Sequence, residues 1–148
     1  MLRERTGGEQ MTPAERVDRW LNKVTDDIET AEILIERGKL LNAAFFCQQS
    51  IEKAFKAVIE TEKVVPPHTH NLYMLATIAK VDGQLNSEQT DFIKSLAFFY
   101  IESRYSDVKM NVAKNCDIGM VTKIFEQTKE MVKWLSSLSK ERLSRLNS

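Results

Sequence analysis

The residues whose chemistry is most suggestive lie together at 104–107, where the sequence reads Arg-Tyr-Ser-Asp. Arg104 carries a planar guanidinium that can hold a phosphate or a carboxylate through two parallel hydrogen bonds, and Tyr105 offers an aromatic face with a hydroxyl tip. A nucleotide presents a phosphate and a base, so Arg104, Tyr105 and Asp107 are the first candidate binding residues. The alternative is structural: Arg104 pairs with Asp107 or Glu102 at a helix end, and Tyr105 packs on the protein body.

Two histidines, His68 and His70, flank a threonine. A metal site needs a third or fourth ligand, and no nearby Cys, His or Asp cluster supplies one, so we expect no metal site and no cofactor. We expect His70 to help cap the helix that follows it. A second option is that His70 joins a polar pocket around Arg104.

A set of polar residues falls on one predicted helix: Gln48, Gln49, Glu52, Lys53 and Lys56. The simplest interpretation is a solvated helix face opposite an apolar stripe. The functional alternative uses Lys53 and Lys56 as phosphate contacts on the wall of a cleft.

Composition limits the class of protein. The chain has 148 residues, enough for one domain with a real core, and 21 basic residues balance 21 acidic ones. Strong sequence-independent binding to nucleic acid would need a basic surplus, so RNA is only weakly supported as a partner. The first ten residues lack the apolar run of a signal peptide, and no stretch approaches the roughly 20 apolar residues of a membrane span. We therefore expect a cytoplasmic protein with reduced thiols and no membrane contact.

Apolar residues recur at helical spacing in five segments, and no segment of useful length alternates with period two. We expect helices from Pro13 to about Gly38, from about 40 to 62, from 71 to about 83, from about 87, and after Asp117. Their start signals are residues at the expected helix beginnings, namely Thr12 with Glu15, His70 or Asn71, Asn86 or Ser87, and Asp117. The prediction is an all-α antiparallel up-and-down bundle of about five helices at 12–140, with a flexible leader at 1–11 and a frayed tail at 141–148.

The second and fourth predicted helices carry more apolar residues than one buried stripe needs. The surplus residues are Phe45, Phe46 and Ile59 on the second helix and Ile93, Phe98 and Ile101 on the fourth. A second apolar face is typical of a helix that packs against another subunit, so we expect a homodimer built on these helices. Cys47 lies on the apolar stripe of the second helix and is expected to be an inert small hydrophobe.

Three segments occur in a recognisable order: "NAAFFCQQSIEKAFKAVI", "PPHTHNLYMLA" and "FFYIESRYSD". Together they resemble the HEPN family (higher eukaryotes and prokaryotes nucleotide-binding domain), over roughly residues 17–138. The resemblance implies a helical bundle that commonly forms homodimers. It also implies that members often act beside a small nucleotidyltransferase, while many others are metal-independent ribonucleases, including toxins.

The ribonuclease members of that family carry a histidine four to six residues after the arginine. Here Arg104 is followed by Tyr-Ser-Asp-Val-Lys-Met-Asn-Val, and no histidine occurs downstream. The sequence therefore resembles the Arg-Tyr branch, which is linked to nucleotidyltransferases and to nucleotide binding. The candidate residues of this chain for binding ATP or GTP are Arg104, Tyr105, Asp107, Lys53 and His70.

Three functions remain open at this point. The first is a non-catalytic subunit that binds a nucleotide or a partner and works with a minimal nucleotidyltransferase. The second is a toxin-like ribonuclease with an atypical site, for example His70 beside Arg104. The third is a plain helical adaptor without a small-molecule site.

Overall fold

The computed structural model describes residues 10–102 and 116–146. Within these ranges the chain forms five α-helices, one short 3₁₀ helix and no strand, which confirms the predicted all-α class. The elements are α1 (Pro13–Glu36), α2 (Leu40–Glu60), α3 (Leu72–Ile78), η2 (Asp82–Gln84), α4 (Ser87–Glu102) and α6 (Ile118–Leu146).

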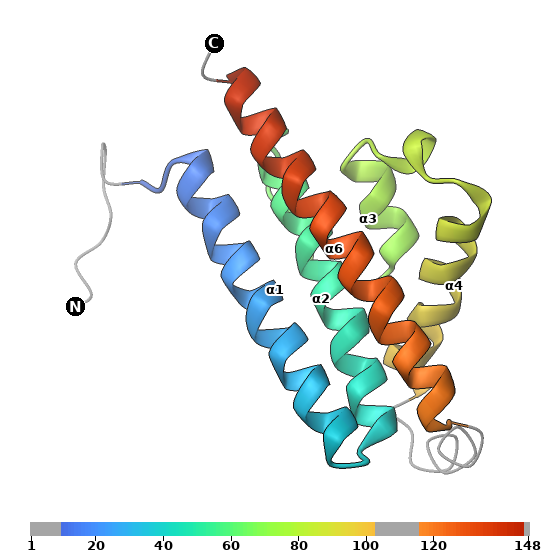
Figure 1. The fold of residues 1–148 in the computed structure, drawn as a ribbon. Coiled ribbons are helices and arrows are strands. Elements are labelled where there is room, and N and C mark those ends of the chain that lie inside the picture. Colours follow the sequence, from blue (N-terminus) through green and yellow to red (C-terminus); the bar gives the residue numbers. More distant parts are fainter. Residues whose placement is uncertain (1–9, 103–115, 147–148) are drawn as a thin grey trace.

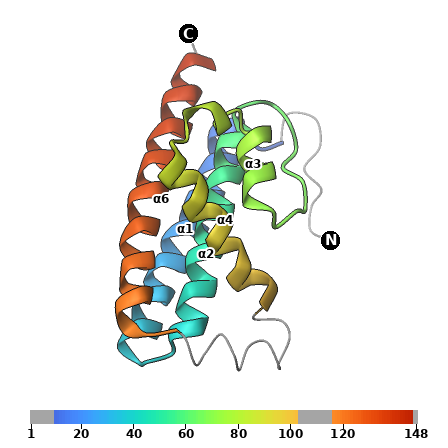
Figure 2. The same cartoon turned by 90° about the vertical axis from the view of Figure 1, so that its right-hand side faces the viewer.

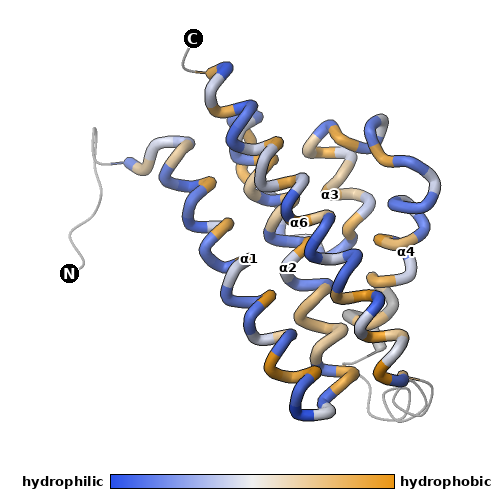
Figure 3. Tube along the Cα trace, viewed as in Figure 1, coloured by the Kyte–Doolittle hydropathy of each residue, from blue (hydrophilic) through white to orange (hydrophobic). Residues whose placement is uncertain are grey.

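Helix α2 occupies the centre of the bundle. It packs against α1 and α6 on one side and against α3 and α4 on the other, so all four other helices contact it. Figures 1 and 2 show the long helices α1, α2 and α6 running side by side, with α3 and α4 covering the remaining side of α2. A helix surrounded in this way has little solvent-facing surface, and in Figure 3 its tube is largely pale or orange.

The helix starts follow the capping residues seen in the sequence. Thr12 and Glu15 form a reciprocal capping box at the start of α1, which also has a proline in its first turn. The Asn71 side chain accepts from the Met74 amide at the start of α3. Asn86 caps α4 and Asp117 caps α6 in the same way, at 2.7 Å from the Gln89 amide and 2.8 Å from the Met120 amide. These side chains satisfy amides that would otherwise lack partners in the first helical turn.

The α1–α2 turn depends on Gly38. Its φ of 74° lies in the left-handed region, which a glycine enters without steric cost, and it follows directly after the last turn of α1. The two helices therefore pack antiparallel after a connection of only three residues, Arg37, Gly38 and Lys39.

The apolar core is built mainly around α2. Fully buried members include Ile51, Phe55, Ile59, Leu75, Ile93 and Leu135. Ile59 and Ile93 were expected to belong to a surplus apolar face, so this part of the homodimer argument is wrong: both lie inside the single-chain core. Phe45 and Phe46 are only partly buried, with their rings edge to face at 5.6 Å. The side chains of Phe98 and Ile101 lie outside the described residues.

The last described segment of the chain belongs to the longest helix. Helix α6 continues to Leu146, so residues 141–146 of the expected tail are helical. In this segment the Arg142 guanidinium donates to the Ala79 carbonyl at 2.6 Å and to the Lys80 carbonyl at 3.2 Å. These carbonyls follow the end of α3, so Arg142 joins the last turns of α6 to the α3 end.

Candidate functional site

The expected nucleotide-binding residues divide into two groups. Arg104, Tyr105 and Asp107 lie outside the described residues, so their predicted roles stay predictions. Lys53 and His70 lie on described elements, and each has an intramolecular acidic partner.

Lys53 pairs with Asp27 of α1, with Nζ 2.7 Å from Oδ2. The Asp27 carboxyl is buried, and this burial raises its pKa above the ordinary value, although the hydrogen bond and charge of Lys53 act in the opposite direction. Lys53 therefore compensates a buried acidic group. A phosphate that recruited Lys53 would have to compete with Asp27.

The predicted solvated face of α2 is wrong for three of its five residues. Gln48, Glu52 and Lys56 are buried, with exposed fractions of 0%, 4% and 7%. Glu60, one turn further, is buried as well. These four residues, spaced four apart along α2, are called here the polar ladder. It is buried because α1 and the segment before α3 cover this side of α2, which the sequence of α2 alone does not reveal.

At one end, the polar ladder is fixed by α1. The two Glu60 oxygens accept from Arg16 Nε at 3.0 Å and from Trp20 Nε1 at 2.9 Å. The Lys56 ammonium lies 5.5 Å from the centre of the Trp20 ring, within the range of a cation–π contact. A buried carboxylate is tolerated when its oxygens have such partners.

At the other end, Glu52 contacts three groups, one of which is the Gln48 side-chain amide at 3.5 Å. Its Oε2 accepts from Lys56 Nζ at 3.1 Å, and its Oε1 lies 2.9 Å from His70 Nδ1. Gln48 contributes a longer contact of 3.4 Å to the backbone oxygen of His70. The expectation that His70 caps α3 is wrong, because Asn71 fills that role. Glu52 instead orients the His70 imidazole, whose side chain remains 44% exposed.

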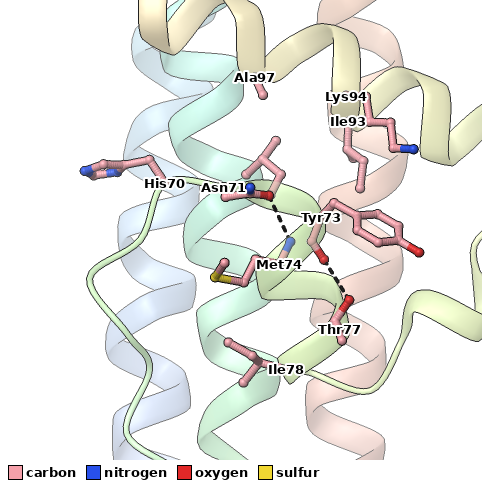
Figure 4. Close-up of a pocket in the computed structure, with 10 residues that line it drawn as sticks. His70, Asn71, Tyr73, Met74, Thr77, Ile78, Ile93, Lys94 and Ala97 are labelled. Carbon is pink, nitrogen blue, oxygen red and sulfur yellow. Dashed lines mark hydrogen bonds between the residues drawn. The ribbon is translucent and has the colours of Figure 1, made fainter.

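An apolar groove begins beside His70 and runs between α3 and α4. It encloses about 720 Å³. Leu72, Ile78, Ile93 and Ala97 supply apolar lining, and Tyr73, Met74 and Lys94 supply exposed groups. Figure 4 shows Tyr73 and Lys94 together on one side of α3, with His70 pointing away from them. The Lys94 ammonium lies 5.2 Å from the centre of the Tyr73 ring.

This groove combines features that suit a planar anionic ligand or a partner side chain. Apolar lining favours burial of a flat ring, an exposed aromatic can stack, and a lysine can meet a phosphate or carboxylate. Tyr73, Met74 and Lys94 belong to none of the sequence patterns that indicated a binding site. A signal was present, because Tyr73 and Met74 are large apolar residues beside Leu72 and Leu75, and a helix of this length buries only one face.

Other chemistry in the described residues is limited. Within residues 10–102 and 116–146, no three His, Cys, Asp or Glu side chains cluster as metal ligands. Burial raises the pKa of the Cys47 thiol to about 11, against a smaller opposite effect of the Thr128 hydroxyl, so Cys47 stays protonated and unreactive near neutral pH. None of the helices in the described ranges combines the length and apolar content needed to cross a membrane.

The described elements form a helical-bundle domain in which a buried polar ladder and an apolar groove lie on either side of the α3 start. A comparison with family models matches the HEPN domain over residues 17–140, most of the chain. The chain therefore belongs to the HEPN domain family, as the sequence motifs predicted. Searches of curated proteins and of solved structures found no significant match.

Proposed function

We propose that this chain is a non-catalytic HEPN subunit that binds a nucleotide or a partner protein and acts with a minimal nucleotidyltransferase. The observation that carries the proposal is the absence of any histidine after Arg104 in the sequence. Cleavage of RNA by acid–base catalysis needs a group that exchanges protons near neutral pH, and arginine does not.

Contacts of His70 tie its imidazole to α2. Glu52 holds its Nδ1 at 2.9 Å, and the same carboxylate is shared with Lys56. This arrangement connects His70 to the structural polar ladder.

The groove between α3 and α4 supports ligand binding. Ala97 of α4 lines it, and α4 continues to Glu102, two residues before Arg104 in the sequence. We propose that a nucleotide base uses the apolar lining beside Tyr73, and that its phosphates use Lys94 and Arg104. The same groups would also suit a partner segment in which an aromatic side chain lies next to an acidic one.

A ribonuclease assay tests the first half of the proposal. We expect no cleavage of structured or single-stranded RNA above the background of a mock preparation. Cleavage that persists through purification and disappears in His70→Ala would instead favour an atypical ribonuclease that uses His70.

Titration calorimetry with ATP and GTP tests the second half. Arg104→Ala should weaken nucleotide binding by about ten- to hundredfold, because a charge-assisted contact is lost, and should reduce its salt dependence. Tyr105→Ala should weaken binding by a similar factor and leave the salt dependence unchanged. Arg37→Ala, an exposed arginine at the end of α1, is the matched control and should bind normally.

Co-purification tests the partner. A nucleotidyltransferase encoded beside this chain, co-expressed with it, should elute with it as one complex. If the wild-type protein neither binds millimolar nucleotide nor retains such a partner, the adaptor function without a small-molecule site replaces this proposal.

A further inference from the structure

A second groove lies on the opposite side of the molecule from α3, between α1 and α6. Figure 1 shows these two helices side by side with α2 behind them. The groove encloses about 550 Å³, and its apolar lining consists of Leu21, Val24, Ile28 and Val132. Val24 and Val132 belong to the core, so the groove opens directly above buried apolar residues.

The two walls of this groove are straight rows of polar residues. The α1 wall is Asp18, Asn22, Thr25 and Glu29, and the α6 wall is Lys129, Lys133, Ser136 and Lys140. Both rows repeat at intervals of three or four residues, which keeps them on one face of each helix. Each row spans about 16 Å, or three helical turns, at a rise of about 1.5 Å per residue.

The walls carry opposite charge. The α1 wall presents two carboxylates, and the α6 wall presents three ammonium groups. Among the described residues no ion pair joins one wall to the other: Lys129 pairs with Glu126 of its own helix, and Asp27, on another face of α1, pairs with Lys53. The charged walls therefore face one another across an apolar floor without closing over it.

We propose that this groove is a docking site for one amphipathic helix of a partner protein. The helix would place an apolar stripe on the floor, an acidic edge along the α6 lysines and a basic edge along the α1 carboxylates. Two straight parallel walls of three turns match the i, i+3, i+4, i+7 anchors of a helix bound in a groove. With α1, α2 and α6, the docked helix completes a four-helix bundle.

The charge pattern argues against other classes of partner. A nucleic acid would be repelled by Asp18 and Glu29 along one whole wall. An anionic membrane surface favours an apolar face whose flanking polar residues are all basic, and one flank of this groove is acidic. A partner helix with two different edges satisfies both walls, and only one direction of its chain does so, because reversing the helix exchanges its edges.

The test uses three synthetic 15-residue helical peptides with the same leucine stripe and a fluorescent label. One carries glutamates on one edge and lysines on the other, one carries glutamates on both edges, and one carries lysines on both. Fluorescence anisotropy measures their binding to the full chain. We expect the mixed-edge peptide to bind about tenfold more tightly than either uniform peptide.

Charge reversal of one wall provides the decisive variant. In Lys133→Glu/Lys140→Glu the α6 wall keeps one ammonium, Lys129, and gains two carboxylates, so its net charge becomes negative like that of the α1 wall. The preference should then move to the all-lysine peptide by at least about tenfold. Lys39→Glu/Lys123→Glu changes the net charge equally at exposed positions that do not line the groove, and it should keep the preference for the mixed-edge peptide. Thermal melts of both variants check that they fold, and a change of preference cannot arise from unfolding.

Three outcomes would overturn the proposal. The first is equal binding of all three peptides by the wild-type chain. The second is an unchanged preference in folded Lys133→Glu/Lys140→Glu. The third is a wild-type dimer, measured by light scattering, that dissociates in this variant but not in the control, because the groove would then hold a second copy of the chain.

Discussion

Buried charges make individual residues of this bundle unusually sensitive to substitution. The Asp27 carboxylate depends on Lys53, and burial of this acid raises its pKa more than Lys53 lowers it. We expect Lys53→Met to lower the free energy of unfolding by about 2 kcal/mol, because it leaves a buried charge unpaired while part of the site remains open to water. Urea denaturation measures this change.

The double variant makes the test specific. Asp27→Asn alone should cost little, and Asp27→Asn/Lys53→Met should recover most of the stability lost in Lys53→Met, since the stranded charge is gone. If Lys53→Met is as stable as the wild type and loses only ligand affinity, Lys53 is a phosphate contact and not a structural partner.

The raised pKa of the buried Cys47 thiol leads us to expect that the stability of the chain depends on pH. Its pKa is about 11 in the folded chain and near the ordinary thiol value when unfolded. Because the folded pKa is the higher one, the stability contributed by the neutral thiol is complete below about pH 9 and is lost as the pH rises toward 11. Between these values the wild type should lose about 2 kcal/mol more than Cys47→Ala, since one pKa unit corresponds to about 1.4 kcal/mol.

Chemical denaturation at pH 9, 10 and 11 in reducing buffer measures the two slopes. Lysine and tyrosine titrations are common to both proteins and cancel in the difference. If the free energy of unfolding fell equally with pH in the wild type and in Cys47→Ala, the raised pKa of Cys47 would be contradicted.

At the scale of the elements, the helix ends could be predicted from the sequence and the solvent-facing sides of α2 could not. Thr12, Asn71 and Asp117 act through amides three residues away, so a local pattern is sufficient. Gln48, Glu52 and Lys56 have the same spacing as an ordinary solvated face, and their burial depends on α1 and on the segment before α3. Their partners, such as His70, lie many residues away in the sequence, and no local pattern identifies them.

The contact of α6 with the end of α3 gives a prediction for these two elements. Arg142→Ala should lower the free energy of unfolding by about 1.5–3 kcal/mol, the range for a hydrogen bond made by a charged group. It should also speed amide exchange in 72–81, because the Ala79 and Lys80 carbonyls lose their donor. Hydrogen–deuterium exchange read by mass spectrometry locates the effect.

Arg145→Ala is the matched control, since Arg145 is exposed and bonds to Glu141 of the same helix. It should leave exchange in α3 unchanged. Equal exchange in α3 for Arg142→Ala and the wild type would show that α6 does not hold this end of the bundle.

For the whole molecule, the homodimer remains a prediction, but fewer apolar residues now support it. Ile59 and Ile93 belong to the core, which leaves Phe45 and Phe46 as the described residues of the expected dimer face. Light scattering at micromolar concentration should give twice the 17.0 kDa mass of the chain. Phe45→Glu should give the monomer mass with a cooperative melt, because a partly buried charge at an interface opposes association. A monomer mass for the wild type would contradict the prediction.

The arrangement of the whole bundle was only partly accessible from the sequence. Helical periodicity predicted the class and the approximate number of helices, because each helix records its own apolar face. The sequence of α2 does not reveal its central position. A helix at the edge of a bundle shows the same kind of apolar stripe, which in α2 is Ala43, Cys47, Ile51 and Ala54. The residues at 104–107 were selected for the chemistry of their side chains. Their role as a binding site remains a prediction, because they lie outside the described residues.

The polar ladder has a consequence for the register in which α2 packs along α1. An apolar stripe of small residues would tolerate a slide of α2 along α1 by one turn, because similar side chains replace one another. The polar ladder reads Gln48, Glu52, Lys56, Glu60, so the same slide would place Lys56 where Glu60 accepts from Arg16 and Trp20. A cation would then face two donors with no acceptor present. The order of charges along the polar ladder therefore fixes the register of α2 against α1, because a shift by one turn would be energetically unfavourable.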